Sequence, residues 1–193
     1  MTILLTGASG FLGAKIKNEI KKDHKLICLG RQSSNDIICD LSTGVPEMPH
    51  DVDVLIHVAG KAHSYPKTEA EKQAFFDVNV TGTQHLLQAL ETSRVQKVIF
   101  ISSVSVYGLE EGTLIPESTP LHGVSPYALS KIQAEAMITS WCQTRKVSYL
   151  ILRLPLVVGP NPLGNLKKII DAIQMVRYVR IAKGNAQKSM VLA

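Results

Sequence analysis

Apolar runs without helical spacing alternate along the chain with segments whose apolar residues recur every three or four positions. The apolar runs predict buried strands at residues 3–5, 25–29, 36–40, 53–60, 97–101 and 148–152. One segment with helical spacing begins at residue 11, and others cover residues 68–92, 126–144 and 166–177. Strands and helices that alternate in this way are typical of a parallel sheet covered on both faces. The pattern therefore predicts an α/β fold with a doubly wound parallel sheet and helices on both faces.

A glycine turn joins the first predicted strand to the first helix. Gly7 allows a sharp turn, Gly10 allows the backbone to approach a pyrophosphate, and Gly13 allows the helix to pack closely on the sheet. The free N–H groups and the positive end of the dipole at the helix start then face a phosphate. A plain tight turn is the alternative. The position directly after an N-terminal strand favours dinucleotide binding and a Rossmann-type sheet.

Composition is that of an ordinary globular protein with one domain over residues 1–193. The chain is 45% hydrophobic and 19% charged. Cys28, Cys39 and Cys142 are too few and too scattered for a disulfide framework or a zinc site, so no metal is expected. No charged leader precedes the first strand and no apolar stretch reaches about 18 residues. These features predict a cytoplasmic protein with no membrane partner.

The net charge of +5 has two interpretations. A basic surface can bind nucleic acid, but the basic residues form no run with interleaved aromatics, so no nucleic-acid partner is expected. Five lysines instead lie mostly on the polar side of the first helix and at its exit: Lys15, Lys17, Lys21, Lys22 and Lys25. They form a solvated helix face, and their field would also attract a phosphorylated ligand.

The residue after the second strand selects the dinucleotide. An acidic side chain there bonds the ribose hydroxyls of NAD, whereas a basic one accommodates the extra phosphate of NADP. Arg31 can meet a phosphate with paired hydrogen bonds, so we expect NADP, against the alternative of a surface arginine. NAD remains an alternative cofactor, because a bend of the loop would bring the Asp36 carboxylate to the ribose. Asp40 is placed to accept from an adenine amino group, or is a turn residue without a ligand.

A second group of residues suits proton transfer. Tyr127 and Lys131 are four apart on a predicted helix and share one face. A nearby ammonium lowers the pKa of a phenol from its reference value near 10, which makes Tyr127 a usable acid/base. Ser103 follows the fifth strand at the carboxyl edge of the sheet, where its hydroxyl can bond the same substrate oxygen. A helix surface without function is the alternative for the Tyr–Lys pair alone.

Together these motifs resemble the extended short-chain dehydrogenase/reductase family, in the branch of nucleotide-sugar epimerases and dehydratases. The stretches that carry the resemblance run in family order: Thr6–Gly13, Asp40–Leu41, His57–Gly60, Asn79–Thr83, Ile101–Gly108, Pro126–Lys131, Leu152–Arg153 and Gly159–Pro160. They cover nearly the whole chain.

The resemblance implies roles for individual residues. Tyr127 would be the catalytic acid/base, Lys131 would hold the nicotinamide ribose and lower the tyrosine pKa, and Ser103 would be the third member. The nicotinamide carries the hydride, and the protein positions it. The residues implied to line the cofactor, besides the glycines, Arg31 and Lys131, are Phe11, Leu12, Asp40, Leu41, Val58, Ala59 and Gly60. Asn79 is a helix or water-network residue in the family and is not counted as catalytic.

Within the family, the stretch after the fifth strand separates the reactions. Dehydratases have Thr-Asp-Glu where this sequence has Ser103-Val104-Ser105, so a 4,6-dehydratase is disfavoured. The stretch is closer to the 4-epimerase pattern, whereas NADP suits a ketoreductase that exchanges its cofactor at each turnover. We therefore expect an NAD(P)-dependent nucleotide-sugar epimerase or 4-ketoreductase. The alternative is a non-catalytic dinucleotide sensor, which would not need the Tyr–Lys pair.

The length of the chain and the apolar faces of two helices bear on domain organisation and oligomeric state. Family members commonly continue for another hundred or more residues, so the chain is expected to be truncated before most of a C-terminal substrate domain. The resemblance also implies a homodimer formed by the helices at residues 68–92 and 126–144. Their apolar faces would otherwise belong to the core.

Overall fold

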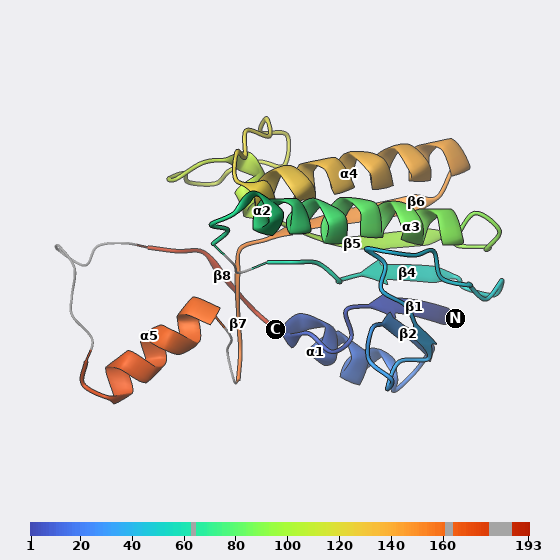
Figure 1. The fold of residues 1–193 in the computed structure, drawn as a ribbon, viewed down its shortest axis with the longest axis horizontal. Helices are drawn as coiled ribbons and strands as arrows, with labels where there is room; N and C mark the ends of the chain where they lie inside the picture. The colour runs from blue at the N-terminus through green and yellow to red at the C-terminus, as the bar shows by residue number, and fades with distance from the viewer. Residues whose placement is uncertain (63–64, 161–163, 178–186) are drawn as a thin grey trace. The chain divides into compact units, whose positions relative to one another are not determined.

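The computed structural model describes residues 1–62, 65–160, 164–177 and 187–193 (Figure 1). These residues form two compact units, Met1–Arg153 and Leu154–Ala193. The sequence predicts a single domain over residues 1–193, and the predicted Rossmann-type sheet lies in the first unit.

Six strands form the sheet of the first unit, in the order β3-β2-β1-β4-β5-β6. Their bounds are β1 Thr2–Thr6, β2 Lys25–Gly30, β3 Ile37–Ile38, β4 Val54–His57, β5 Lys97–Ser103 and β6 Ser148–Leu154. Strand β1 runs parallel to both β2 and β4, and β4 runs parallel to β5. The strand order reverses at β1, so the carboxyl ends of β1 and β4 form the crevice in which doubly wound sheets bind ligands. The predicted doubly wound parallel sheet is confirmed.

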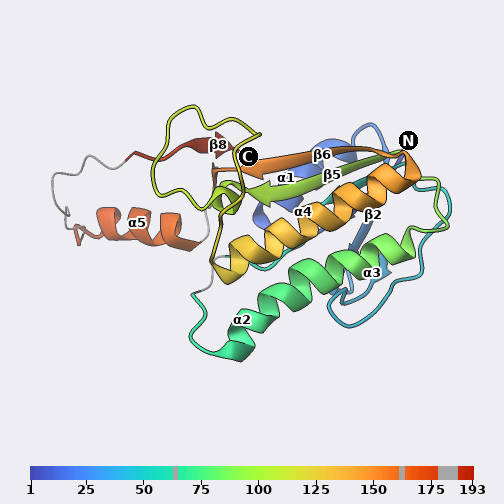
Figure 2. The ribbon, with the colours of Figure 1, turned by 90° about the horizontal axis from the view of Figure 1, so that it is seen from above.

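Helices cover both faces of this sheet. They are α1 Phe11–Ile20, α2 Glu69–Phe76, α3 Gly82–Ala89 and α4 Pro126–Arg145, with a π-helical segment η1 Asp77–Thr81 between α2 and α3 and a 3₁₀ turn η2 Val104–Tyr107 after β5. In Figures 1 and 2, α3 and α4 lie side by side on one face, and α1 lies on the other. The prediction of helices on both faces is therefore confirmed.

The strands are apolar throughout because both of their faces are buried. Leu4 of β1 packs in a core with Leu86 and Ile138 of the α3 and α4 layer. Its neighbours Ile3 and Leu5 point to the opposite face, where they pack with Ile16 of α1. The short apolar run at the N-terminus is therefore the central strand of the sheet.

Three predicted elements differ from the observed ones. The strand expected at 53–60 ends at His57 because the Thr6 hydroxyl accepts the N–H groups of Val58 and Ala59. The strand expected at 36–40 shrinks to β3 because the Asp40 carboxylate accepts the N–H of residue 42 and turns the chain. The helix expected at 68–92 contains the π-helical turn η1.

The second unit contains α5 Gly164–Gln174 and a pair of parallel strands, β7 Leu156–Val158 and β8 Met190–Leu192. Helix α5 corresponds to the helix predicted at 166–177, whereas both strands were missed. Residues 161–163, between the motif Gly159–Pro160 and α5, lie outside the described residues. Among the helices of the described residues, none combines the length and the apolar character that crossing a membrane requires. Within the same ranges, no group of three His, Cys, Asp or Glu side chains is arranged to hold a metal ion.

Candidate active site

In the turn after β1, the backbone geometry requires glycine at two positions, residues 7 and 13. Gly7 adopts φ +72°, and a Cβ there would lie 2.6 Å from the backbone nitrogen of Ala59. A Cβ at Gly13 would lie 2.0 Å from the Gly7 carbonyl oxygen. A Cβ at Gly10 would meet only that same oxygen, at 3.3 Å. Gly10 is the N-cap of α1 and has no side chain to bond the free N–H groups of the helix start, so this end suits an anion such as a pyrophosphate.

A chain of buried hydrogen bonds joins this turn to the end of β4. The Thr6 hydroxyl accepts from the N–H groups of Val58 and Ala59 at 3.2 and 3.1 Å. It lies 2.7 Å from Nδ1 of His57, whose Nε2 lies 3.0 Å from the Thr83 hydroxyl. Thr83 donates its one proton to the Asn79 carbonyl oxygen, so His57 must donate from Nε2 and accept at Nδ1.

His57 stays neutral in this chain. Burial, and secondarily the charge of Lys131, lower the pKa of His57 to about 3. Sequence reasoning missed Thr6, His57 and Thr83 as a network because a histidine in an apolar strand shows no spacing that reveals its partners. The network fixes the β4 end, at which Val58, Ala59 and Gly60 were predicted to line a cofactor.

Lys131 lies next to that strand end. A Cβ at Gly60 would be 3.2 Å from the Lys131 Nζ. This Nζ donates to the Ile101 carbonyl oxygen at 2.9 Å and lies 4.5 Å from the centroid of the Phe100 ring. Burial lowers the pKa of Lys131 to about 8, and the charge of Glu135 opposes this shift. The structure therefore brings together the predicted cofactor edge and the predicted catalytic lysine.

Tyr127 stands in the first turn of α4. Ser125 caps the helix by accepting the Ala128 N–H at 3.1 Å, and Pro126 occupies the first helical turn. Burial raises the pKa of Tyr127, and a hydrogen bond with Ser103 partly offsets the increase. The expectation that Lys131 lowers this pKa is not met here, because its ammonium donates to the Ile101 carbonyl instead.

Ser103 lies at the end of β5 and has two bonds to Ser105. Its hydroxyl accepts the Ser105 N–H at 3.2 Å and lies 2.5 Å from the Ser105 hydroxyl oxygen. Ser103 also lies close enough to the Tyr127 side chain to lower the pKa of its phenol. The three predicted groups of the proton-transfer site therefore lie at one place, the carboxyl edge of β5 beside the start of α4.

Asn79 supports this place from η1. Its side-chain amide donates to the Lys61 carbonyl at 3.1 Å and to the Ser130 hydroxyl at 2.8 Å, while its oxygen accepts the Lys61 N–H. Ser130 in turn donates to the Tyr127 carbonyl at 2.8 Å. The π-helical turn thereby connects the residue after Gly60 to the first turn of α4.

A profile of the NAD dependent epimerase/dehydratase family matches residues 3–188. The chain belongs to this family. Its sequence is 28% identical to the N-acetyl-alpha-D-glucosaminyl-diphospho-ditrans,octacis-undecaprenol 4-epimerase of Escherichia coli O157:H7, over 97% of this chain and 58% of the relative. It is 30% identical to the UDP-glucose 4-epimerase of Vibrio cholerae, over 89% of this chain and 56% of the relative. The chain thus spans a little over half the length of these relatives.

Solved structures share the fold. The UDP-glucuronic acid 4-epimerase of Bacillus cereus, in complex with UDP-glucuronic acid and NAD, superposes with a TM-score of 0.80 at 24% identity. The match covers 100% of this chain and 69% of that structure. The superposition shows the shared fold, and the profile match over residues 3–188 confirms the family resemblance inferred from the motifs.

In this epimerase/dehydratase chain, Arg31 does not stand alone after β2. Its side chain is 77% exposed, and its Nη1 lies 3.8 Å from the Asp40 carboxylate. Asp40 also accepts from the Ser42 hydroxyl and N–H, and these bonds, led by that of the Ser42 hydroxyl, lower its pKa. Asp36 accepts the Cys28 N–H of β2 at 2.8 Å. The Asp36 carboxylate, which was expected to reach the ribose of NAD after a bend of the loop, is therefore bonded to the backbone of β2 instead.

The remaining residues predicted to line the cofactor are Phe11, Leu12 and Leu41. Phe11 and Leu12 begin α1 directly after Gly10. Leu41 is buried in the core beside Gly82, and its carbonyl oxygen lies 2.8 Å from Nδ1 of His85. The side chain of Leu41 therefore contributes to packing.

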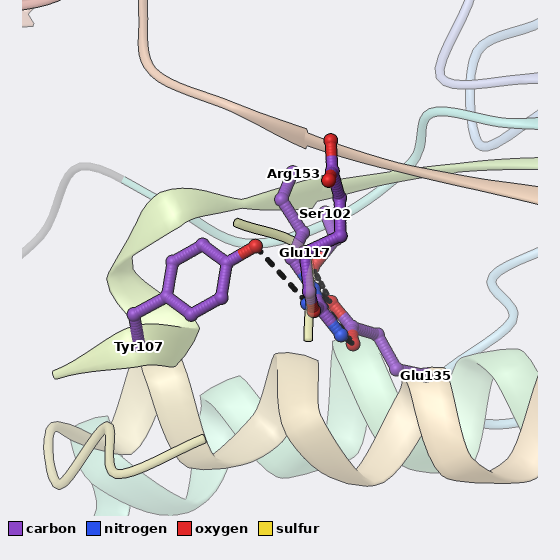
Figure 3. Close-up of polar contacts among 5 residues, drawn as sticks. All are labelled: Ser102, Tyr107, Glu117, Glu135 and Arg153. Atoms are coloured by element: carbon purple, nitrogen blue, oxygen red, sulfur yellow. Dashed lines mark hydrogen bonds and ion pairs between the residues drawn. The ribbon is translucent and has the colours of Figure 1, made fainter. Parts of the chain in front are cut away.

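Two charged residues that the sequence reasoning left without a role meet beside the site. Glu135 of α4 and Arg153 of β6 form an ion pair at 2.8 Å, shown in Figure 3. Glu135 stands four residues after Lys131, a spacing that would place both on one helix face and could have revealed it. No local pattern shows that Arg153 reaches the same place.

Proposed function

We propose that the chain carries the dinucleotide-binding and proton-transfer groups of a nucleotide-sugar 4-epimerase that uses NAD. One observation carries this proposal: Gly60, at the crevice formed by β1 and β4, lies against the Nζ of Lys131, which shares α4 with Tyr127. A hydride acceptor and a proton acceptor must act on the same sugar carbon and its hydroxyl, so their sites have to adjoin.

The residues at the crevice suit a dinucleotide. The open N-terminus of α1 at Gly10, Phe11 and Leu12 would hold the pyrophosphate. The β4 end at Val58, Ala59 and Gly60 would line the opposite side of the cofactor, and Lys131 would bond the nicotinamide ribose. When bound, the nicotinamide would accept a hydride from the sugar and return it.

NAD is proposed instead of the NADP expected from Arg31. The family is described as NAD dependent, and the Bacillus cereus epimerase was solved with NAD, so NADP has no support from these comparisons. Arg31 is close to Asp40, whose negative charge would disfavour an added phosphate at the same place. Arg31 then acts as a surface partner of Asp40.

In the proposed reaction, Tyr127 takes the proton of the sugar 4-hydroxyl as the hydride leaves C4, and it returns the proton when the hydride is returned to the other face. Ser103 would donate a hydrogen bond to the same oxygen. The interaction with Ser103 favours the phenolate form of Tyr127, against the effect of burial. Val104 and Ser105 supply no carboxyl group for the removal of water, so these side chains support hydride and proton transfer at C4 without dehydration. The 4-epimerases among the relatives favour epimerisation over reduction.

The half-reaction tests this assignment. The chain is loaded with NAD and mixed with UDP-glucose, the substrate in the name of the Vibrio cholerae relative. We expect absorbance near 340 nm from reduced cofactor, and we expect Tyr127→Phe to slow its appearance by about 100-fold or more while NADH affinity stays nearly constant. An unchanged rate in Tyr127→Phe would remove the acid/base assignment. If the wild type binds the dinucleotide but UDP-glucose does not reduce the bound NAD, the result would favour the dinucleotide sensor.

The expected homodimer and cytoplasmic location are further proposals. A groove of about 700 Å³ between α3 and α4 is lined by Leu87, Met137 and Trp141, among others. We propose that a second copy of this chain covers the groove. Ala136 lines the same groove and is exposed, so Ala136→Arg should convert a dimer into a monomer in sedimentation experiments without unfolding the protein.

The proposed cytoplasmic location is tested by fractionation of cells that produce the protein.

A further inference from the structure

Arg153 makes an unusual number of directed contacts for one side chain. Its Nε and Nη2 donate to both carboxylate oxygens of Glu135, at 3.2 and 2.8 Å. Its Nη1 donates to the Tyr107 hydroxyl at 3.1 Å and to the Glu117 carbonyl oxygen at 2.8 Å, as Figure 3 shows. Ser102 completes the cluster by donating its hydroxyl proton to Glu135.

The cluster is shielded from water, which strengthens its charge-assisted bonds. The side chains of Glu135 and Arg153 are 5% and 19% exposed, and Ser102 and Tyr107 are buried. The Arg153 guanidinium carbon also lies 5.0 Å from the centroid of the Tyr107 ring. Such a fork of fixed donors holds several partners in one geometry, which a lysine could not do.

The contacts join every element that carries the candidate proton-transfer groups. Ser102 adjoins Ser103 at the end of β5, and Tyr107 closes the η2 turn that contains Ser105. Glu135 lies one helical turn beyond Lys131 and two turns beyond Tyr127 on α4. Glu117 belongs to the loop at residues 108–125 that leads into α4.

We propose that Glu135 and Arg153 are positioning residues of this site: their ion pair fixes the end of β5, with Ser103, against the face of α4 that bears Tyr127 and Lys131, and it fastens the 108–125 loop through Glu117. The catalytic consequence rests on the function proposed above. The positioning itself is a property of the chain without ligand.

Glu135 has a second effect, through its charge. Burial lowers the pKa of Lys131, and the Glu135 carboxylate opposes that decrease. The other titratable or charged groups described around Lys131 and Glu135 include Arg153, which is paired with Glu135, His57 of β4, which is neutral, Tyr127 of α4, and Lys61, whose Nζ lies 5.5 Å from the Phe75 ring. Among these groups only Glu135 carries a negative charge at neutral pH, so it is the one that favours the protonated lysine.

The Lys131 titration distinguishes this role from a merely structural one. The chain is prepared with lysine ¹³C-labelled at Cε, and the Lys131 resonance is identified by its loss in Lys131→Met. We expect Glu135→Gln to lower the pKa of Lys131 by about one unit, because the carboxylate is lost while the side-chain shape is retained. Glu135→Asp, which keeps the charge, should stay closer to the wild type. An unchanged or raised pKa of Lys131 in Glu135→Gln would show that the Glu135 charge does not favour the protonated lysine, and that result would overturn this part of the proposal.

Arg153→Lys tests the loop contact. The substitution keeps the positive charge beside Glu135 but loses the fork, so the Lys131 titration should stay near that of the wild type. Digestion by a glutamate-specific protease after Glu110 or Glu111, which lie in the exposed part of the loop, should become several-fold faster. An unchanged digestion rate in a folded Arg153→Lys protein would show that Arg153 does not fasten the loop.

The half-reaction with NAD and UDP-glucose connects the cluster to catalysis. Glu135→Gln should retain NADH affinity and slow cofactor reduction at least about tenfold, whereas loss of affinity with an unchanged rate would contradict positioning. If the wild type binds no dinucleotide, the proposed function fails, and the lysine titration and the protease digestion still decide whether Glu135 and Arg153 hold these elements together.

Discussion

At the scale of single residues, the glycines of the turn after β1 differ in what they do. Gly7 and Gly13 are required by the turn itself, since a Cβ at either one would overlap backbone atoms. A Cβ at Gly10 would meet only the Gly7 carbonyl oxygen, at 3.3 Å, so the turn itself requires this glycine less than the other two. In the proposed function, the backbone at Gly10 approaches the pyrophosphate of the dinucleotide.

Two alanine substitutions separate these requirements. Gly7→Ala should lower the free energy of unfolding by at least about 1–3 kcal/mol, because φ +72° is strained for a residue with a side chain. Gly10→Ala should change stability by less than that, yet weaken NADH binding by about tenfold or more. Urea unfolding and NADH fluorescence titration measure the two effects. Equal stability losses in both variants would contradict the division.

Lys131 gives the molecule a pH dependence whose sign can be worked out. Its pKa is lowered from 10.5 to about 8 in the folded chain, so between these values the unfolded chain binds more protons than the folded one. Stability contributed by this residue therefore rises with pH across that window, and below pH 8 its buried charge costs stability.

Comparison with Lys131→Met isolates the contribution of Lys131 to the pH dependence of the free energy of unfolding. The variant should be more stable than the wild type at pH 7, and its advantage should shrink as the pH rises from 8 to 10.5. Urea unfolding of both proteins at pH 7 and pH 10 checks this, because other titrating groups cancel in the difference. A constant difference would mean that Lys131 is as well solvated in the folded chain as in the unfolded one.

At the scale of elements, α2 and α4 both begin with a hydroxyl side-chain cap but carry different groups. Thr68 caps α2 in a capping box with Glu71, and Ser125 caps α4. The two caps therefore form a matched pair with which to test whether α4 positions the site.

Ser125→Ala and Thr68→Ala should each cost about 1 kcal/mol of stability. Ser125→Ala should also weaken NADH binding several-fold, because Tyr127 and Lys131 stand in the first two turns of α4. Thr68→Ala should leave NADH affinity nearly unchanged. Similar losses of affinity in both variants would show that the start of α4 has no special role.

The elements also show what periodicity could and could not predict. The alternation of apolar runs predicted the six strands and both helical layers, because burial on two faces leaves a strong signal. It missed η1, since a π-helical turn requires only one extra residue in a helical segment. The turn places Asn79 against Lys61 and Ser130, a contact that depends on residues 18 and 51 positions away.

At the scale of the whole molecule, the strand order explains why the candidate site could be predicted in part. The ends of several elements meet at one edge of a doubly wound sheet, and at or near these ends lie Gly7, Gly60, Ser103 and Tyr127. Topology therefore brings them together once the fold is known. The partners of His57 and Arg153 depend on side-chain packing between distant segments, which spacing does not reveal.

We propose that this edge binds a nicotinamide dinucleotide, specifically NAD, beside Lys131 and Tyr127. A fluorescence titration of the chain with NADH and with NADPH, repeated on Arg31→Ala, tests this binding. We predict that NADH binds at least about tenfold more tightly than NADPH and that Arg31→Ala changes NADH affinity by less than about threefold. A preference for NADPH that Arg31→Ala abolishes would contradict the assignment of NAD, and the absence of binding by either nucleotide would contradict the site itself.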